Sequence, residues 1–105
     1  MGTENPRITT QTLAVLAAFT SFQPDGLSGA EIAKSTNLKS GTLYPILFRL
    51  EKAKLLESRW EAEEPSDLGR PRRRFYRLTG LGENVFQEER RRVSGIIGGL
   101  VWQQS

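Results

Sequence analysis

The chain has 105 residues and a formal net charge of +3, and it contains neither cysteine nor histidine. This composition excludes disulfides, zinc sites built from cysteine or histidine, and catalysis that needs a thiolate or an imidazole. The length predicts one small domain. No apolar run approaches the roughly 20 residues of a membrane span, and residues 1–7 show no signal-peptide pattern. We therefore expect a soluble cytoplasmic protein that is not an enzyme, with no catalytic residue, metal site or cofactor and no contact with a membrane.

Two helices are predicted in the first third of the chain. Thr9 or Thr10 is a suitable N-cap for an apolar helical pattern that begins at Leu13. A turn follows, and Ser28 and Glu31 have the spacing of a capping box, in which each side chain accepts a hydrogen bond from the backbone of the other residue. The capping box predicts a short second helix directly after Ser28.

A third helix is expected after a sharp turn at Asn37, because asparagine tolerates the left-handed backbone that such a turn needs. Ser40 is the predicted cap of this helix. Pro45 removes one backbone hydrogen bond and is expected to distort the helix near its start. The residues at helical spacing that should face the core are Leu43, Ile46, Leu47 and Leu50.

Two strands and a last helix complete the predicted order. Residues 55–60 and 73–78 have strand-like sequences, and residues 62–71 between them form a polar loop. Thr79 is the expected cap of a helix that runs to about residue 102. The fold class is therefore mainly α (α+β): a winged helix-turn-helix with a two-stranded β wing and a C-terminal helix. Residues 1–79 form the winged helix-turn-helix, and residues 80–105 form the last helix of the same compact unit.

Residue sizes support the helix-turn-helix. Ala33 is small where the two helices would cross, Asn37 takes the turn, and Leu43 and Ile46 are apolar where the second helix packs on the first. An ordinary helical hairpin is the alternative. If the motif is real, residues 39–49 form a recognition helix whose start offers free N–H groups to a phosphate. Its predicted DNA-binding residues are Lys39, Ser40, Thr42, Tyr44 and Arg49. Packing on the neighbouring helix is the alternative role for Tyr44.

Arginines crowd the tip of the predicted wing. Their mutual repulsion favours an anionic partner, so Arg70, Arg72 and Arg73 are predicted to contact double-stranded DNA. The alternative is pairing within the hairpin. We expect Arg74 and Arg77 to pair in this way and Arg70 and Arg72 to remain free. The acidic neighbours available for pairing are Glu57, Glu61, Glu63, Glu64 and Asp67.

The last helix has the pattern of a helix–helix contact. Apolar residues recur every seven positions, and others flank them, so the helix is predicted to form a homodimer. The predicted dimerisation residues are Phe86, Val93, Ile96, Ile97 and Leu100. A solitary helix packed on its own domain is the alternative, and it is disfavoured because so small a monomer offers this stripe little cover.

Several short motifs together resemble the PadR family of bacterial transcriptional regulators, in its short form with one C-terminal helix. They are the sequences at 40–45 (SGTLYP), 49–51 (RLE), 55–58 (LLES), 69–73 (GRPRR) and 76–79 (YRLT), with Gly82. The resemblance covers about residues 12–82. It implies a dimeric DNA-binding regulator, usually a repressor, on an inverted-repeat operator. It also implies a small hydrophobic or phenolic effector in some members. Residues 88–92 (EERRR) lack the central aromatic residue of the drug-sensing branch.

A second function is compatible with the same sequence. A winged helix can serve as a protein- or RNA-interaction module without operator specificity. Such a module need not keep a basic wing tip together with a polar exposed face on the third helix, and this sequence keeps both. Operator binding predicts a steep salt dependence together with a large preference for specific over nonspecific DNA, whereas a nonspecific binder shows the salt dependence alone.

Overall fold

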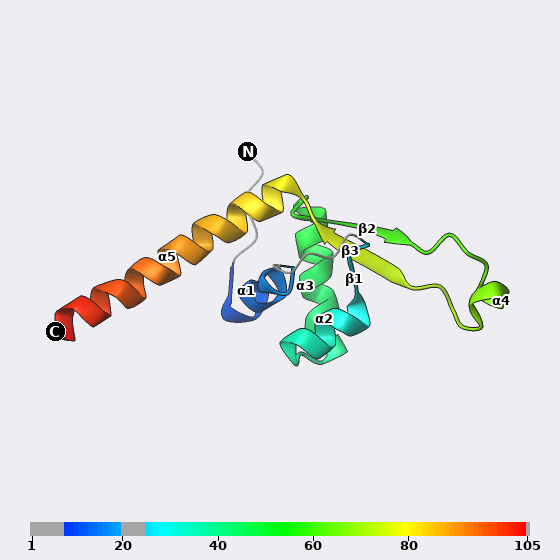
Figure 1. The fold of residues 1–105 in the computed structure, drawn as a ribbon, viewed down its shortest axis with the longest axis horizontal. Helices are drawn as coiled ribbons and strands as arrows, with labels where there is room; N and C mark the ends of the chain where they lie inside the picture. The colour runs from blue at the N-terminus through cyan, green and yellow to red at the C-terminus, as the bar shows by residue number, and fades with distance from the viewer. Residues whose placement is uncertain (1–7, 20–24, 105) are drawn as a thin grey trace.

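Five helices and three strands make up the described part of the computed structural model, which covers residues 8–19 and 25–104, with side chains described to residue 98. In chain order they are α1 (Thr10–Ala17), β1 (Leu27–Ser28), α2 (Gly29–Thr36), α3 (Ser40–Lys52), β2 (Leu56–Trp60), α4 (Pro65–Leu68), β3 (Arg74–Leu78) and α5 (Gly80–Gln104). The helices α1, α2 and α3 gather at the centre, while the β2–β3 wing and α5 project from opposite sides (Figure 1). The predicted winged-helix fold is confirmed.

Local capping fixes the first two helices. Thr9 is the N-cap of α1, and its hydroxyl accepts a hydrogen bond from the backbone N of Thr12 at 3.1 Å. The capping box of α2 is present, since Ser28 Oγ accepts from Glu31 N at 3.2 Å and Glu31 Oε1 accepts from Ser28 N at 2.8 Å. Asn37 ends α2 in the left-handed conformation, with φ 61°. These three features match the sequence prediction.

The start of α3 corrects one expectation. The N-cap is Lys39, whose side chain makes no capping hydrogen bond, and Ser40 is already the first helical residue. The backbone N–H groups of Thr42 and Leu43 both donate to the Lys39 carbonyl at 2.9 Å, so the backbone alone closes the first turn. The helix continues through Pro45.

The sheet has three strands, where the sequence predicted two. β3 lies in the middle and pairs antiparallel with β2 on one side and with β1 on the other. β1 has only two residues, and the second of them, Ser28, is also the N-cap of α2. Because β1 pairs with β3, it joins the wing directly to the start of α2. The predicted polar loop also contains α4, a single helical turn that ends at Gly69 in the left-handed conformation, φ 69°.

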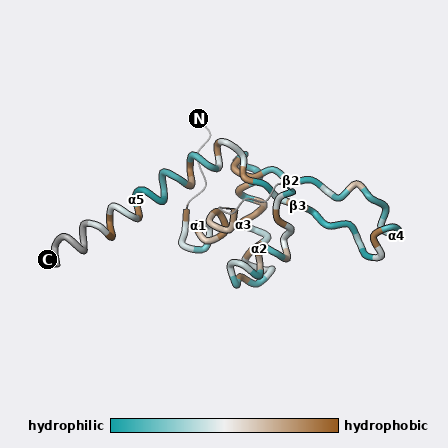
Figure 2. The backbone as a smooth tube through the Cα atoms, in the orientation of Figure 1, coloured by the Kyte–Doolittle hydropathy of each residue, from teal (hydrophilic) through white to brown (hydrophobic). Residues whose placement is uncertain are grey.

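The core lies where the helices cross and where the sheet meets them. The inward residues predicted for α3 are all buried, and Ile32 of α2 is buried with them. Figure 2 shows that hydrophobic residues gather at this centre and that the wing is mostly hydrophilic. The start of α5 adds Val85 and Phe86 to the same core. Among the residues whose side chains are described, the buried hydrophobic ones are Val15, Leu16, Leu27, Ile32, Leu43, Ile46, Leu47, Leu50, Leu55, Leu56, Tyr76, Val85 and Phe86.

Candidate nucleic-acid interface

The outer face of α3 carries the residues predicted for the recognition helix. Four of the five are exposed, namely Lys39, Ser40, Tyr44 and Arg49, and Thr42 is half-buried. The side chains that face the opposite way, toward the core, are Leu43, Ile46, Leu47 and Leu50. One side of the helix therefore packs the domain together, and the other side offers polar and basic groups to a partner.

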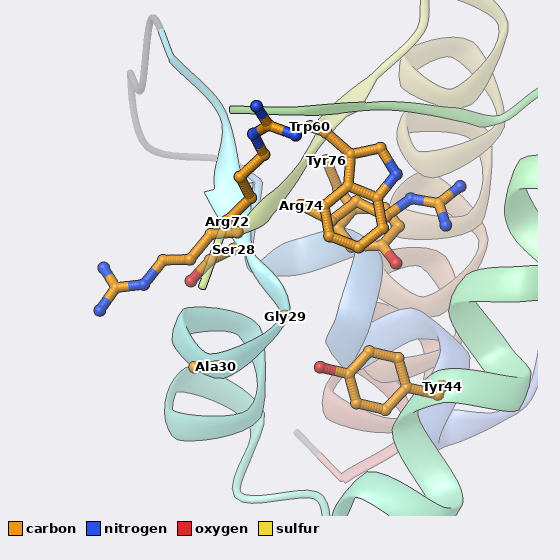
Figure 3. A pocket seen from close by; sticks show the side chains of 9 residues that line it. Ser28, Gly29, Ala30, Tyr44, Trp60, Arg72, Arg74 and Tyr76 are labelled. Atoms are coloured by element: carbon orange, nitrogen blue, oxygen red, sulfur yellow. The ribbon is translucent and has the colours of Figure 1, made fainter. Parts of the chain in front are cut away.

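Tyr44 is partly exposed on the outer face of α3 and also packs against the neighbouring helix α2. Its side chain is 48% exposed. Its hydroxyl lies against Gly29 at the first turn of α2, so closely that a Cβ atom at Gly29 would collide with it. Figure 3 shows the ring extending from α3 with its hydroxyl directed toward Gly29. The phenol group therefore reaches the start of α2, where backbone N–H groups are available to an anion.

A groove of about 390 Å³ separates the wing from the start of α2 and from Tyr44 of α3. Figure 3 shows the rings of Tyr44, Trp60 and Tyr76 around it. Its lining residues are Ser28, Gly29, Ala30, Tyr44, Trp60, Arg72, Arg73, Arg74 and Tyr76. A groove with arginines on one side and a helix N-terminus on the other suits a phosphodiester backbone.

Arg70 and Arg72 form internal pairs, which corrects the expectation that both remain free. Arg70 binds Glu61 through two nitrogens, at 2.6 and 2.9 Å. Arg72 donates to the Glu63 carbonyl at 2.8 Å and forms an ion pair with Glu64 at 3.2 Å. The cause is the turn at α4, which folds the acidic residues of the loop back alongside the arginines.

Arg74 pairs as predicted, but with an unexpected partner. Its guanidinium binds Glu51 of α3 at 3.1 Å and donates to Ser58 Oγ at 2.8 Å. It also lies 5.6 Å from the ring centre of Trp60 and 5.7 Å from that of Tyr76. Because Glu51 lies in α3, beyond the end predicted for the recognition helix, this side chain connects the wing to that helix.

Arg73 differs from its neighbours on the wing. Its backbone N donates to Glu61 Oε1 at 2.8 Å, while its exposed guanidinium has no hydrogen bond or ion pair with any residue in the described part of the chain. Arg77 is exposed on β3, and its pairing stays a prediction. Of the three arginines predicted to contact DNA, Arg73 therefore has its charge available without breaking an internal contact.

Glu61 organises the tip of the wing. Two hydrogen bonds lower the pKa of Glu61 from its ordinary value of 4.5 to about 2. The larger effect comes from the Arg70 side chain, and the next from the backbone of Arg73. The side chain is 13% exposed and receives hydrogen bonds from both residues at once. A lowered pKa means that the ionised, paired form stabilises the folded wing above about pH 4.5, and that this contribution disappears as the pH falls through about 2.

The chemical shift of the Glu61 carboxyl carbon, measured as a function of pH, should therefore show a titration midpoint near 2. Arg70→Gln should raise this midpoint toward the ordinary value, because it removes the largest cause of the shift. Arg92→Gln is the matched control, since Arg92 pairs with Glu89 on α5 and should leave the Glu61 midpoint unchanged. A Glu61 midpoint near 4.5 in the wild-type protein would contradict the pairing.

The predicted dimerisation residues occupy different environments. Phe86 is only 6% exposed and packs in the protein's own core. Val93 is half-buried, whereas Ile96 and Ile97 are 53% and 55% exposed. Leu100 lies on the helical backbone of α5, and its side chain is outside the described part. The exposed members of the stripe are thus on the half of α5 that projects from the domain (Figure 1).

Sequence reasoning missed three residues that shape this surface. Glu51 was not recognised as a partner that holds the wing, and Trp60 and Phe48 were not considered as exposed aromatic residues of the interface. Glu61 was among the acidic residues named for pairing, and it binds Arg70. Phe48 was accessible to the argument, because it lies one helical turn after Tyr44 and away from the core positions. Glu51 was not, because its contact with Arg74 joins residues that are 23 positions apart.

The described residues offer neither a metal site nor a membrane-spanning helix. Residues 8–19 and 25–104 contain no cluster of three acidic, histidine or cysteine side chains suited to a metal ion. Among the helices of this part of the chain, none is both long and apolar enough to cross a membrane.

Comparison with known proteins gives matches in family and in fold. The family model described as Transcriptional regulator PadR-like family matches residues 29–88. A MepR mutant of Staphylococcus aureus aligns over 93% of this chain and 67% of its own, with 26% identity and a TM-score of 0.76. A PadR family transcription regulator of Clostridium difficile aligns over 92% of this chain and 100% of its own, with 24% identity and a TM-score of 0.74.

A second MepR mutant of S. aureus, bound to an oligodeoxyribonucleotide, aligns over 92% of this chain and 66% of its own, with 25% identity and a TM-score of 0.70. The chain thus spans about two thirds of the length of MepR. No curated protein sequence matches it. The family match covers more than half of the residues and includes α2, α3 and the whole wing. The chain belongs to the PadR-like family of transcriptional regulators.

Proposed function

We propose that the protein is a homodimeric repressor that binds an inverted-repeat operator in double-stranded DNA. In this proposal residues 1–79 contact the DNA and residues 80–105 hold two copies together, in the cytoplasm. The main support for this function is that Arg74 joins the wing to α3 through Glu51, with a basic groove between the two elements. A recognition helix and a wing fixed to each other suit binding across a major groove and its adjacent backbone.

Charge and free donors support the same proposal. Arg49 and Lys52 lie in the last turn of α3, and Arg73 has its guanidinium unpaired within the described chain. Tyr44 adds a hydroxyl beside the start of α2. Cationic side chains that contact phosphates release condensed counterions, so the proposed complex should weaken steeply as salt rises.

Fluorescence anisotropy on labelled duplexes tests this function. The DNA upstream of the protein's own gene is compared with a scrambled duplex across a salt series. Tight binding to the first duplex, with two subunits per site, is the expected result. Weak and equal binding to this duplex, to the scrambled one and to duplexes selected from a random pool would favour the alternative, an interaction module without operator specificity.

Arg73→Ala should weaken binding to every duplex and lower the slope of log affinity against log salt by about one unit, as expected for one lost phosphate contact. Arg91→Ala is the matched control, because it removes the same charge from an exposed position on α5, away from the wing. An unchanged slope for Arg73→Ala, or an equal change for Arg91→Ala, would exclude Arg73 from the interface.

Release by a small hydrophobic or phenolic effector completes the proposal, and family membership is its support. The expected result is a fall in anisotropy of the protein–operator complex when such a compound is added. Binding that does not change across a series of phenolic acids and hydrophobic drugs would limit the protein to effector-independent repression.

A further inference from the structure

The centre of the outward face of α3 carries no charged side chain. Gly41, Pro45 and Phe48 recur every three or four residues on the side opposite the core positions, Lys52 follows them in the last turn, and all four are exposed. Phe48 is 65% exposed, the largest exposed fraction among the large hydrophobic side chains of the described residues. It takes no part in the hydrophobic core. A phenyl ring therefore projects from the middle of the proposed recognition face.

The exposed charged residues beside Phe48 in the last turn of α3 are basic. They are Arg49 and Lys52. The one acidic residue of this turn, Glu51, is bound to Arg74 of the wing. A partner of this face must accordingly be anionic at its edges and present an apolar group to the ring at its centre.

Duplex DNA meets both requirements. Its phosphates flank the major groove, which admits an α-helix. On the floor of that groove the base edges are hydrogen-bond donors and acceptors, with one apolar exception, the C5-methyl group of thymine. A phenyl ring gains nothing from a polar base edge, whereas contact with this methyl group removes apolar surface of both partners from water.

We propose that Phe48 is a specificity-determining residue that contacts the C5-methyl group of a thymine in each half-site of the operator. This inference rests on the proposed function, in which α3 enters the major groove. The methyl contact requires no charge from Phe48, so it adds selectivity for a thymine to the nonselective attraction of Arg49 and Lys52 for phosphates.

The test removes the methyl group itself. Duplexes that bind the wild-type protein are first selected from a random pool, and each thymine is then replaced singly by deoxyuridine, which lacks only that methyl. For one thymine per half-site we expect the wild-type affinity to fall about fourfold, the effect of burying one apolar carbon. Replacement in both half-sites should cost about sixteenfold.

Phe48→Ala should bind the thymine and deoxyuridine duplexes with equal affinity. Because this ratio is measured within a single variant, a change in its stability or in the active fraction cancels. Arg73→Ala is the matched control. It should weaken binding to both duplexes by the same factor and keep the wild-type thymine preference, since a phosphate contact does not sense the methyl group.

Two results would overturn the assignment. One is a wild-type protein that tolerates deoxyuridine at every thymine, and the other is a thymine preference that persists in Phe48→Ala. If that variant also had an altered oligomeric state, the ring would belong to a protein contact. Failure of the proposed function is recognised earlier, because the selection would then yield no preferred duplex.

Discussion

The Ile97→Asp variant is expected to sediment as a monomer and to lose operator binding. Ile97 and its neighbour Ile96 are more than half exposed on the part of α5 that projects from the domain. In the proposed dimer these side chains meet a second copy. An aspartate there would be buried without a partner, which costs more than the roughly 2–7 kcal/mol of an unpaired amide or hydroxyl.

Because a two-fold dimer repeats each contact, the substitution acts twice in one interface. The dissociation constant of the dimer should rise at least about 100-fold, since about 1.4 kcal/mol corresponds to a factor of ten. Sedimentation velocity over a concentration series measures this change directly. The fold of the monomer should be unaffected, because Ile97 is exposed to solvent in the single chain.

Ser94→Asp is the control for charge and helix propensity. Ser94 is exposed one turn before Ile97, and helical geometry places it about 100° from the centre of the apolar stripe. It should leave the dimer intact. A dimer that survives Ile97→Asp with unchanged affinity would mean that α5 does not hold the subunits together.

Loss of the dimer should remove most of the affinity for the operator. Two recognition helices that bind one duplex act at a high effective concentration, whereas a monomer must bind each half-site alone. The nonspecific, salt-dependent part of the binding should persist, since the wing and α3 remain in place. The variant thus separates half-site recognition from operator recognition.

Features encoded by neighbouring residues were predictable from the sequence. The capping box of Ser28 and Glu31 and the turn at Asn37 each depend on residues within four positions of one another. The inward positions of α3 follow from helical periodicity alone. The strand patterns of residues 55–60 and 73–78 added the wing, so the order of the long helices and the position of the wing were correct, and the family motifs agree with that order.

Contacts between residues that are distant in the sequence were harder to predict. β1 has two residues and offers no strand pattern, so its pairing with β3 appears only once the domain is folded. The one-turn helix α4 brings Glu61 to Arg70, nine positions away, and thereby removes a charge that the sequence had assigned to DNA. The anionic partners predicted for the crowded arginines are, for Arg70 and Arg72, acidic groups of the protein itself.

The heptad pattern of α5 includes residues of two kinds, some that pack in the protein's own core and some that remain exposed. Phe86 satisfies the repeat, yet it is buried in the core of its own domain. Ile96 and Ile97 satisfy the same stripe and are exposed. A continuous apolar stripe along a helix therefore divides where the helix leaves the domain: its first part stabilises the monomer, and its later part remains for the proposed partner.

Gly82→Ala is expected to destabilise the folded protein severely. Gly82 lies in the first turn of α5, buried against Leu55, in the segment between α3 and β2, and against Leu78 at the end of β3. A Cβ atom at this position would collide with the Leu55 carbonyl and would lie 3.0 Å from Leu78 Cδ1. The Leu55 carbonyl is fixed, since it accepts a hydrogen bond from Thr79 N at 3.1 Å, so the backbone has little freedom to yield.

Overpacking of this kind costs about 1–3 kcal/mol and sometimes more, against a total of about 5–15 kcal/mol for a domain. Chemical denaturation at one fixed protein concentration measures the loss. Gly80→Ala is the matched control, because an added methyl there meets nothing within 4 Å in the same helical turn. Its stability should stay the same or rise by up to about 1 kcal/mol through helix propensity. Equal stabilities for the two variants would show that α5 does not cross Leu55 as closely as the structure places it.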